Sequence, residues 1–119
     1  MSAIPLKLNL NDGSVSFPFT ADAAKKLQRQ LYQLMQSLKA AAQVSSGGRP
    51  KPQQPMEYQF TGDVFLEIFC NPNIYPSPFA AKVLITLRDD RIRLSTEAEL
   101  TRVVEDVNLY LEQVSLQLT

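Results

Sequence analysis

Histidine and tryptophan are absent from this 119-residue sequence, and cysteine occurs once. Without histidine the chain lacks the commonest general base and a frequent metal ligand. We therefore exclude a Ser/His/Asp or Cys/His catalytic arrangement and an ordinary His/Cys zinc site built from this chain alone. The single cysteine, Cys70, excludes an intrachain disulfide and is typical of a protein in a reducing compartment.

Glycine-rich nucleotide-binding motifs and long apolar runs are missing as well. Neither GxxxxGK[ST] nor GxGxxG occurs, so the sequence predicts no cofactor site. No apolar run approaches the roughly 18 residues that cross a bilayer. The first residues, MSAIPLKLNLND, lack the basic start and apolar core of a signal peptide. We therefore expect a cytoplasmic protein with no membrane partner.

The charges balance over the whole chain but not over its two halves. Twelve bases and twelve acids give a net charge of zero. Residues 1–56 carry seven bases and two acids, whereas residues 57–119 carry five bases and ten acids. The halves can attract each other within one fold or across a homodimer, or the basic half can bind an acidic partner. No aromatic residues are interleaved with the bases, so we predict no nucleic-acid binding.

Hydrophobic periodicity in the first half predicts a hairpin followed by a helix. Apolar residues alternate with polar ones on both sides of NDGS, and a turn at Asp12-Gly13 pairs Leu10 with Val15 on one face. After the hairpin, apolar residues recur at spacings of three and four. This spacing predicts one amphipathic helix over residues 20–43 with a basic opposite face.

Residues 44–56 separate the two halves. Glycine, proline, serine and glutamine dominate this stretch. Such a composition cannot bury enough apolar surface to become ordered. We therefore predict a flexible linker inside a single domain that covers residues 1–119.

Strand alternation returns after the linker. Residues 58–70 alternate throughout, which predicts one long strand with a bend at Gly62. Residues 79–87 alternate again and predict the next strand. The sequence RDDR then predicts a two-residue turn that pairs Leu87 with Ile92.

The last helix completes the predicted fold. Thr96 and Glu99 have the spacing of a helix capping box, which predicts a helix over residues 97–115. The predicted order is β-β-α-linker-β-β-β-α, in which the hairpins make the strands antiparallel and each helix has one apolar face. We predict an α+β protein with two layers, a five-stranded antiparallel sheet covered on one face by two helices.

The stretch FCNPNIYPSPF, residues 69–79, contains the cysteine and three prolines. Alternation places Cys70 on the core face, where a small thiol is inert. The prolines stiffen a connection between two strands, and Ile74 and Tyr75 are expected to be exposed on it. We interpret this loop as a connector first and a contact surface second.

The sheet face opposite the core is the more informative feature. Phe65 and Phe69 lie on it, and Leu84 is expected on the same side of the neighbouring strand. If the helices cover only the other face, this one exposes aromatic surface, which usually marks an interaction site. We therefore predict partner binding by Phe65, Phe69, Ile74, Tyr75 and Leu84.

Residues 81–113, AKVLITLRDDRIRLSTEAELTRVVEDVNLYLEQ, resemble small proteins of cyanobacteria. The strand-turn-strand that leads into TEAEL and the helix VEDVNLYLE carry the resemblance, and the stretch is most similar to the CcmS family of carboxysome assembly factors. The resemblance implies a non-enzymatic cytoplasmic adaptor or chaperone that binds a carboxysome shell protein through that protein's flexible tail. It transfers no binding residues to this chain.

Two functional hypotheses follow. In the first, the protein is a non-enzymatic adaptor or assembly chaperone that binds a protein partner through the outer sheet face. In the second, the same face closes a structural homodimer that has no separate ligand. An enzyme is not expected, because the adjacent acids Asp89 and Asp90 belong to a predicted turn, where carboxylates are usually solvated.

Overall fold

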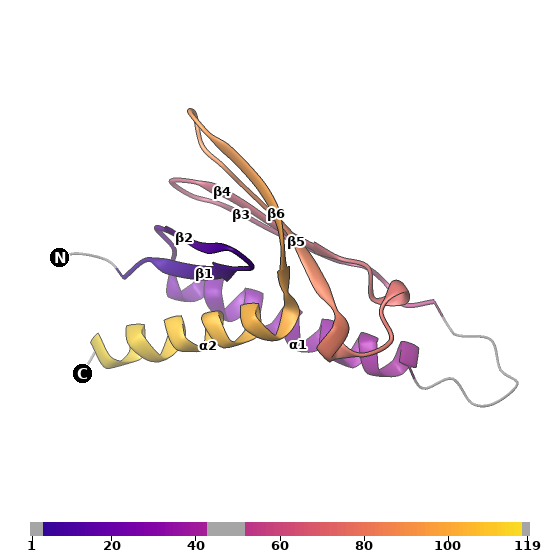
Figure 1. Cartoon of the computed structure of the whole chain (residues 1–119). Helices are drawn as coiled ribbons and strands as arrows, with labels where there is room; N and C mark the ends of the chain where they lie inside the picture. Colours follow the sequence, from indigo (N-terminus) through magenta and orange to yellow (C-terminus); the bar gives the residue numbers. More distant parts are fainter. Residues whose placement is uncertain (1–3, 43–51, 118–119) are drawn as a thin grey trace, which may run out of the picture.

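Six strands and two α-helices form the part of the chain that the computed structural model describes, residues 4–42 and 52–117 (Figure 1). Along the chain the elements are β1 (Leu6–Leu10), β2 (Gly13–Phe17), α1 (Ala21–Ala42), β3 (Met56–Thr61), β4 (Phe65–Cys70), η1 (Pro72–Ile74), η2 (Pro78–Ala80), β5 (Lys82–Arg88), β6 (Arg93–Glu99) and α2 (Leu100–Gln117). The elements η1 and η2 are short 3-10 helices. The predicted α+β class is confirmed.

The strands form two antiparallel sheets rather than one. β1 pairs with β2, and the other four strands are arranged in the order β3-β4-β5-β6. The prediction of a single five-stranded sheet is therefore wrong in the number of strands and of sheets. Both helices lie on the same side of the four-stranded sheet, where α1 contacts β3, and α2 contacts β6, β1 and α1 (Figure 1).

The predicted long strand with a bend at Gly62 is a hairpin. β3 and β4 are joined by a tight turn in which the Gly62 amide donates to the Val64 carbonyl oxygen at 3.0 Å. A Cβ atom on Gly62 would lie 2.6 Å from the Phe60 ring, so a larger residue requires the ring to move. Tyr58 pairs with Ile68, and both are buried, as the alternation predicts. The same alternation fits a bent strand and a hairpin, which explains the error.

The β1–β2 hairpin keeps its predicted face and shifts its register by two residues. Val15 pairs with Leu8 rather than with Leu10, and the turn lies at Asn11-Asp12. Because the side-chain period of a strand is two residues, this shift leaves every side chain on the predicted face.

The β5–β6 hairpin has a longer loop than RDDR predicts. Leu87 pairs with Leu94 and not with Ile92. Asp89 organises the loop, since its Oδ1 atom accepts hydrogen bonds from the amides of Arg91 and Ile92 at 2.8 and 2.9 Å. These two bonds lower the pKa of the Asp89 carboxyl. Ile92 remains in the loop, where its side chain is 65% exposed.

The predicted capping box is part of a strand. Thr96 and Glu99 pair with β5, so the sheet already binds the backbone groups that a helix start would leave free. α2 begins at Leu100, whose amide donates to the Ala81 carbonyl oxygen at 3.0 Å. The helix therefore starts three residues later than predicted.

One hydrophobic core lies between the helices and the sheets. The predicted apolar stripe of α1 is confirmed, with Leu27, Leu31 and Leu38 almost completely buried. The Tyr58 hydroxyl donates to the Ala23 carbonyl oxygen at 3.1 Å. This buried bond fastens β3 to the first turn of α1.

Polar contacts attach α2 to the N-terminal part of the chain. The amide and Nδ2 atoms of Asn9, in β1, each donate to one carboxylate oxygen of Asp106 at 2.8 Å. Gln28 Nε2 donates to Asn108 Oδ1 at 2.8 Å and so joins α1 to α2. The first hairpin and both helices are therefore held together by directional bonds as well as by the core.

The predicted linker, residues 44–56, falls mostly outside the described residues. Residues 52–55 approach β3 without regular secondary structure. Met56 is the first residue of β3 and is buried, so it does not belong to a linker.

Candidate protein-binding site

The face of the four-stranded sheet that points away from the helices consists of cross-strand rows of side chains, and we call it the outer face. Phe69 in β4 pairs with Leu84 in β5. Glu57 in β3 and Glu97 in β6 continue this row on the two flanking strands. Leu84 is 44% exposed. An apolar pair is therefore bounded by one acid on each side at this end of the sheet.

A pocket of about 230 Å³ opens at this row, close to where η1 follows β4. We call it the outer pocket, and its lining residues are Phe69, Cys70, Asn71, Ile74, Tyr75, Lys82, Leu84 and Glu97. Four of the five residues predicted to bind a partner thus lie together. Among them Ile74 is the most exposed, at 66%.

Phe65 is the fifth predicted residue, and it does not line the outer pocket. It lies four residues from Phe69 along β4, or about 13 Å at the usual rise of a strand. Glu67 and Thr86 form the row between them. The guanidinium carbon of Arg88 lies 4.4 Å from the centroid of the Phe65 ring, a cation–π contact that covers this ring. The predicted patch is therefore divided, and only its Phe69 part lines the outer pocket.

Asparagine side chains hold the loop that carries Ile74. Asn71 Oδ1 accepts from both the amide and the Nδ2 atom of Asn73 at 3.0 Å. Asn73 in turn accepts from the Gln53 amide at 2.8 Å and donates to the Gln53 carbonyl oxygen at 2.9 Å. This reciprocal pair ties the loop to the segment before β3. Pro72 is buried beneath it, so the loop is fixed before any partner binds.

We expect Asn73→Ala to loosen this loop. The substitution removes both bonds to Gln53 and the Nδ2 bond to Asn71, each worth about 1 kcal/mol, while the bond from the residue 73 amide to Asn71 remains. Hydrogen exchange should show faster exchange of the Gln53 amide and of the amides in η1, with little change in α2. Gln59→Ala is the matched control, because it removes another exposed amide, which donates to Glu67 at 2.9 Å. Equal exchange in the two variants would contradict the role of Asn73.

The buried Cys70 and the partly buried Tyr75, which both line the outer pocket, are neutral near neutral pH. Burial raises the pKa of the Cys70 thiol to about 11, so the reactive thiolate is scarce. The pKa of Tyr75 is raised first by burial and then by the negative charges of Cys70 and Glu97. A neutral thiol and phenol beside Phe69, Ile74 and Leu84 suit an apolar side chain of a partner better than a catalytic step, while Lys82 and Glu97 are the charged residues of the lining.

Phe79 is an exposed aromatic residue for which the strand alternation predicted the wrong location. The strand predicted over residues 79–87 put its side chain in the core, whereas it lies in η2 and is 85% exposed. Ser77 caps η2, with its Oγ atom accepting from the Ala80 amide at 3.3 Å. The sequence Ser77-Pro78 is the signal for this short helix, because proline is favoured at a first helical position.

Within residues 4–42 and 52–117, no group of three or more His, Cys, Asp or Glu side chains is placed to hold a metal ion. Neither α1 nor α2, as described, is apolar enough over the length needed to cross a membrane.

No protein family, curated protein or solved structure matches this chain. Its function is therefore inferred from the geometry of its own residues.

Proposed function

We propose that the chain is a non-enzymatic protein-binding adaptor or assembly chaperone that uses the outer pocket. The observation that supports this proposal is the convergence of Phe69, Ile74, Tyr75 and Leu84 on one open pocket. Exposed apolar surface of this kind commonly marks an interaction site. The hydrogen-bonded loop also reduces the entropy lost on binding, because Ile74 is already held in place.

The proposed partner is a carboxysome shell protein in the cytoplasm. Residues 81–113, which resemble carboxysome assembly factors, contribute Lys82, Leu84 and Glu97 to the outer pocket. The stretch that carries the resemblance therefore also supplies Leu84, which pairs with Phe69 across β4 and β5. In this proposal an apolar side chain from the flexible tail of the shell protein enters the pocket.

Binding of a purified shell protein, with and without its tail, tests the proposal by isothermal titration calorimetry. We expect Ile74→Ser combined with Leu84→Ser to weaken binding at least about tenfold, since each loses an apolar contact worth about 1 kcal/mol or more. Phe79→Ser is the matched control, because it removes a more exposed apolar side chain outside the pocket. We expect it to leave the affinity unchanged.

The outcomes of this experiment test the proposed partner and the proposed binding site separately. Absence of binding to the shell protein would refute the proposed partner. Binding that survives the Ile74 and Leu84 substitutions would refute the outer pocket as its site. The homodimer remains the alternative, and it predicts a molecular mass that rises with concentration and that the same double variant reduces to the monomer.

A further inference from the structure

The four-stranded sheet has two edge strands, β3 and β6, and we call the side of β3 on which no described strand pairs the free edge. At the opposite edge β6 pairs only with β5 among the described strands, but β1 lies beside it and the first hairpin borders it across a hollow. Among the described strands, β3 pairs only with β4. Its six residues, MEYQFT, contain no lysine or proline and pair with β4 without a bulge. Natural sheets usually protect an edge with such features, because an open edge readily pairs with another extended chain.

α1 runs alongside this free edge. A hollow of about 270 Å³ lies between them, and its walls include Gln30, Gln33 and Ser37 from α1 and residues 54–57 from the β3 side. A strand added to β3 would lie about 4.8 Å beyond it and would therefore cover this hollow. Amide and hydroxyl groups would then line the path of the added chain.

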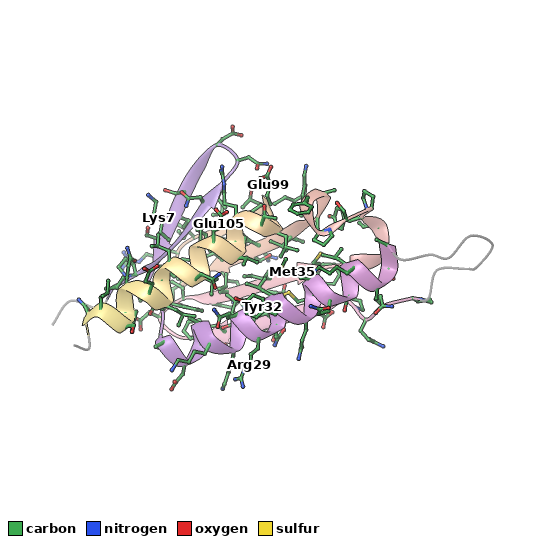
Figure 2. The ribbon with its side chains drawn as sticks, turned by 90° about the horizontal axis from the view of Figure 1, so that it is seen from below. Lys7, Arg29, Tyr32, Met35, Glu99 and Glu105 are labelled. Atoms are coloured by element: carbon green, nitrogen blue, oxygen red, sulfur yellow. The ribbon has the colours of Figure 1, made fainter. Side chains whose placement is uncertain are left out.

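The flank of α1 next to the edge is basic. Lys26 and Arg29 line a second hollow that shares its two glutamines with the first. Figure 2 shows Arg29 on the side of α1 that faces away from α2. Glu57, the only acid in β3, belongs to the outer face, in the row of Phe69. Glu57 also lines the first hollow, so the charged residues around the two hollows are two bases and one acid, which leaves a net positive charge beside the edge.

We propose that β3 binds an extended acidic peptide segment of a partner protein as an additional strand. The peptide backbone pairs with the free edge, and every second side chain faces α1, where its carboxylate meets Lys26 or Arg29. A second copy of this chain fits the edge less well. Pairing of β3 with β3 would bring together two α1 helices that each carry four bases and one acid.

This surface is separate from the outer pocket. The hollow beside β3 and the outer pocket share no lining residue. One partner could occupy both, and either surface could bind when the other is altered. The proposal therefore does not depend on the function proposed above.

A synthetic peptide of about ten residues, in which glutamate alternates with valine, tests the proposal with the full-length protein. We expect it to slow hydrogen exchange of those β3 amides that do not donate to β4, while β6 amides are unaffected. The same peptide with lysine in place of glutamate should not bind. Absence of protection at β3, or equal protection by both peptides, would overturn the proposal.

Two charge-matched double variants locate the peptide on α1. Lys26→Glu with Arg29→Glu should weaken binding of the glutamate peptide roughly tenfold at low salt, because two attractions become repulsions. Lys25→Glu with Lys39→Glu changes the net charge equally, but neither residue lines the two hollows beside β3, and Lys25 lies near Leu111 of α2. Equal weakening by the two variants would mean that only net charge matters and would overturn the proposed site.

Discussion

Asp106→Ala is expected to lower the free energy of unfolding by about 3 kcal/mol, as judged from the usual strength of hydrogen bonds to a charged group. Asp106 is only 8% exposed, and its two carboxylate oxygens accept from the amide and the Nδ2 atom of Asn9. Alanine leaves both Asn9 donors without these acceptors in a partly buried site. The contact joins α2 to β1 across most of the length of the chain, so its loss should also speed hydrogen exchange in the first hairpin.

Urea denaturation measures this effect, and Glu105→Ala is its control. Glu105 is the exposed neighbour of Asp106 on α2, visible in Figure 2, and its removal changes the net charge equally. Asp106→Asn should be intermediate, because it keeps one acceptor oxygen and loses the charge. A loss no larger than that of Glu105→Ala would show that the Asn9 contact contributes little to stability.

Alkaline pH is expected to destabilise the protein through Cys70 and Tyr58. Burial raises the pKa of Cys70 from 9.0 to about 11 and that of Tyr58 from 10.0 to about 12. A raised pKa in the folded state means that the folded protein favours the neutral form. The associated stability is complete below the unfolded pKa values and falls as pH rises toward the folded ones. At about pH 11 these shifts correspond to losses of about 2 kcal/mol from Cys70 and about 1 kcal/mol from Tyr58.

Urea denaturation at pH 8 and at about pH 11 tests this dependence. Cys70→Ala and Tyr58→Phe each lower stability at pH 8, because one opens a small cavity and the other removes the bond to Ala23. The informative quantity is the additional loss between the two pH values. The double variant should lose about 3 kcal/mol less over this interval than the unmodified protein. An equal loss in both proteins would contradict the assignment to these two groups.

Helix α1 shows how far local pattern can predict this fold. Its apolar spacing predicted residues 20–43, and the helix spans Ala21–Ala42. A helix is held by bonds within its own segment, so nearby residues determine its limits. The start of α2 was predicted less well, because pairing of Thr96 and Glu99 with β5 overrides a local capping signal. That pairing depends on residues more than ten positions away along the chain.

At the outer pocket, too, the local pattern predicted some features correctly and missed others. Alternation placed Phe65, Phe69 and Leu84 on the face away from the helices, and the register confirms that they share it. It could not show that Arg88 covers Phe65. Nor could it show that η1 brings Ile74 beside Phe69. Both contacts depend on how strands and a loop meet in space.

By itself the sequence determined which side chains face the core, which catalytic groups are missing, and where charge of each sign is concentrated. Tertiary structure alone decided that residues 58–70 form a hairpin, that β3 is an edge strand of the described sheet and lies beside α1, and which apolar residues of the outer face meet in a pocket. The physical reason is the two-residue period of a strand. A register shift by two residues or a turn in place of a bend preserves that period, so only pairing between distant strands distinguishes the possibilities.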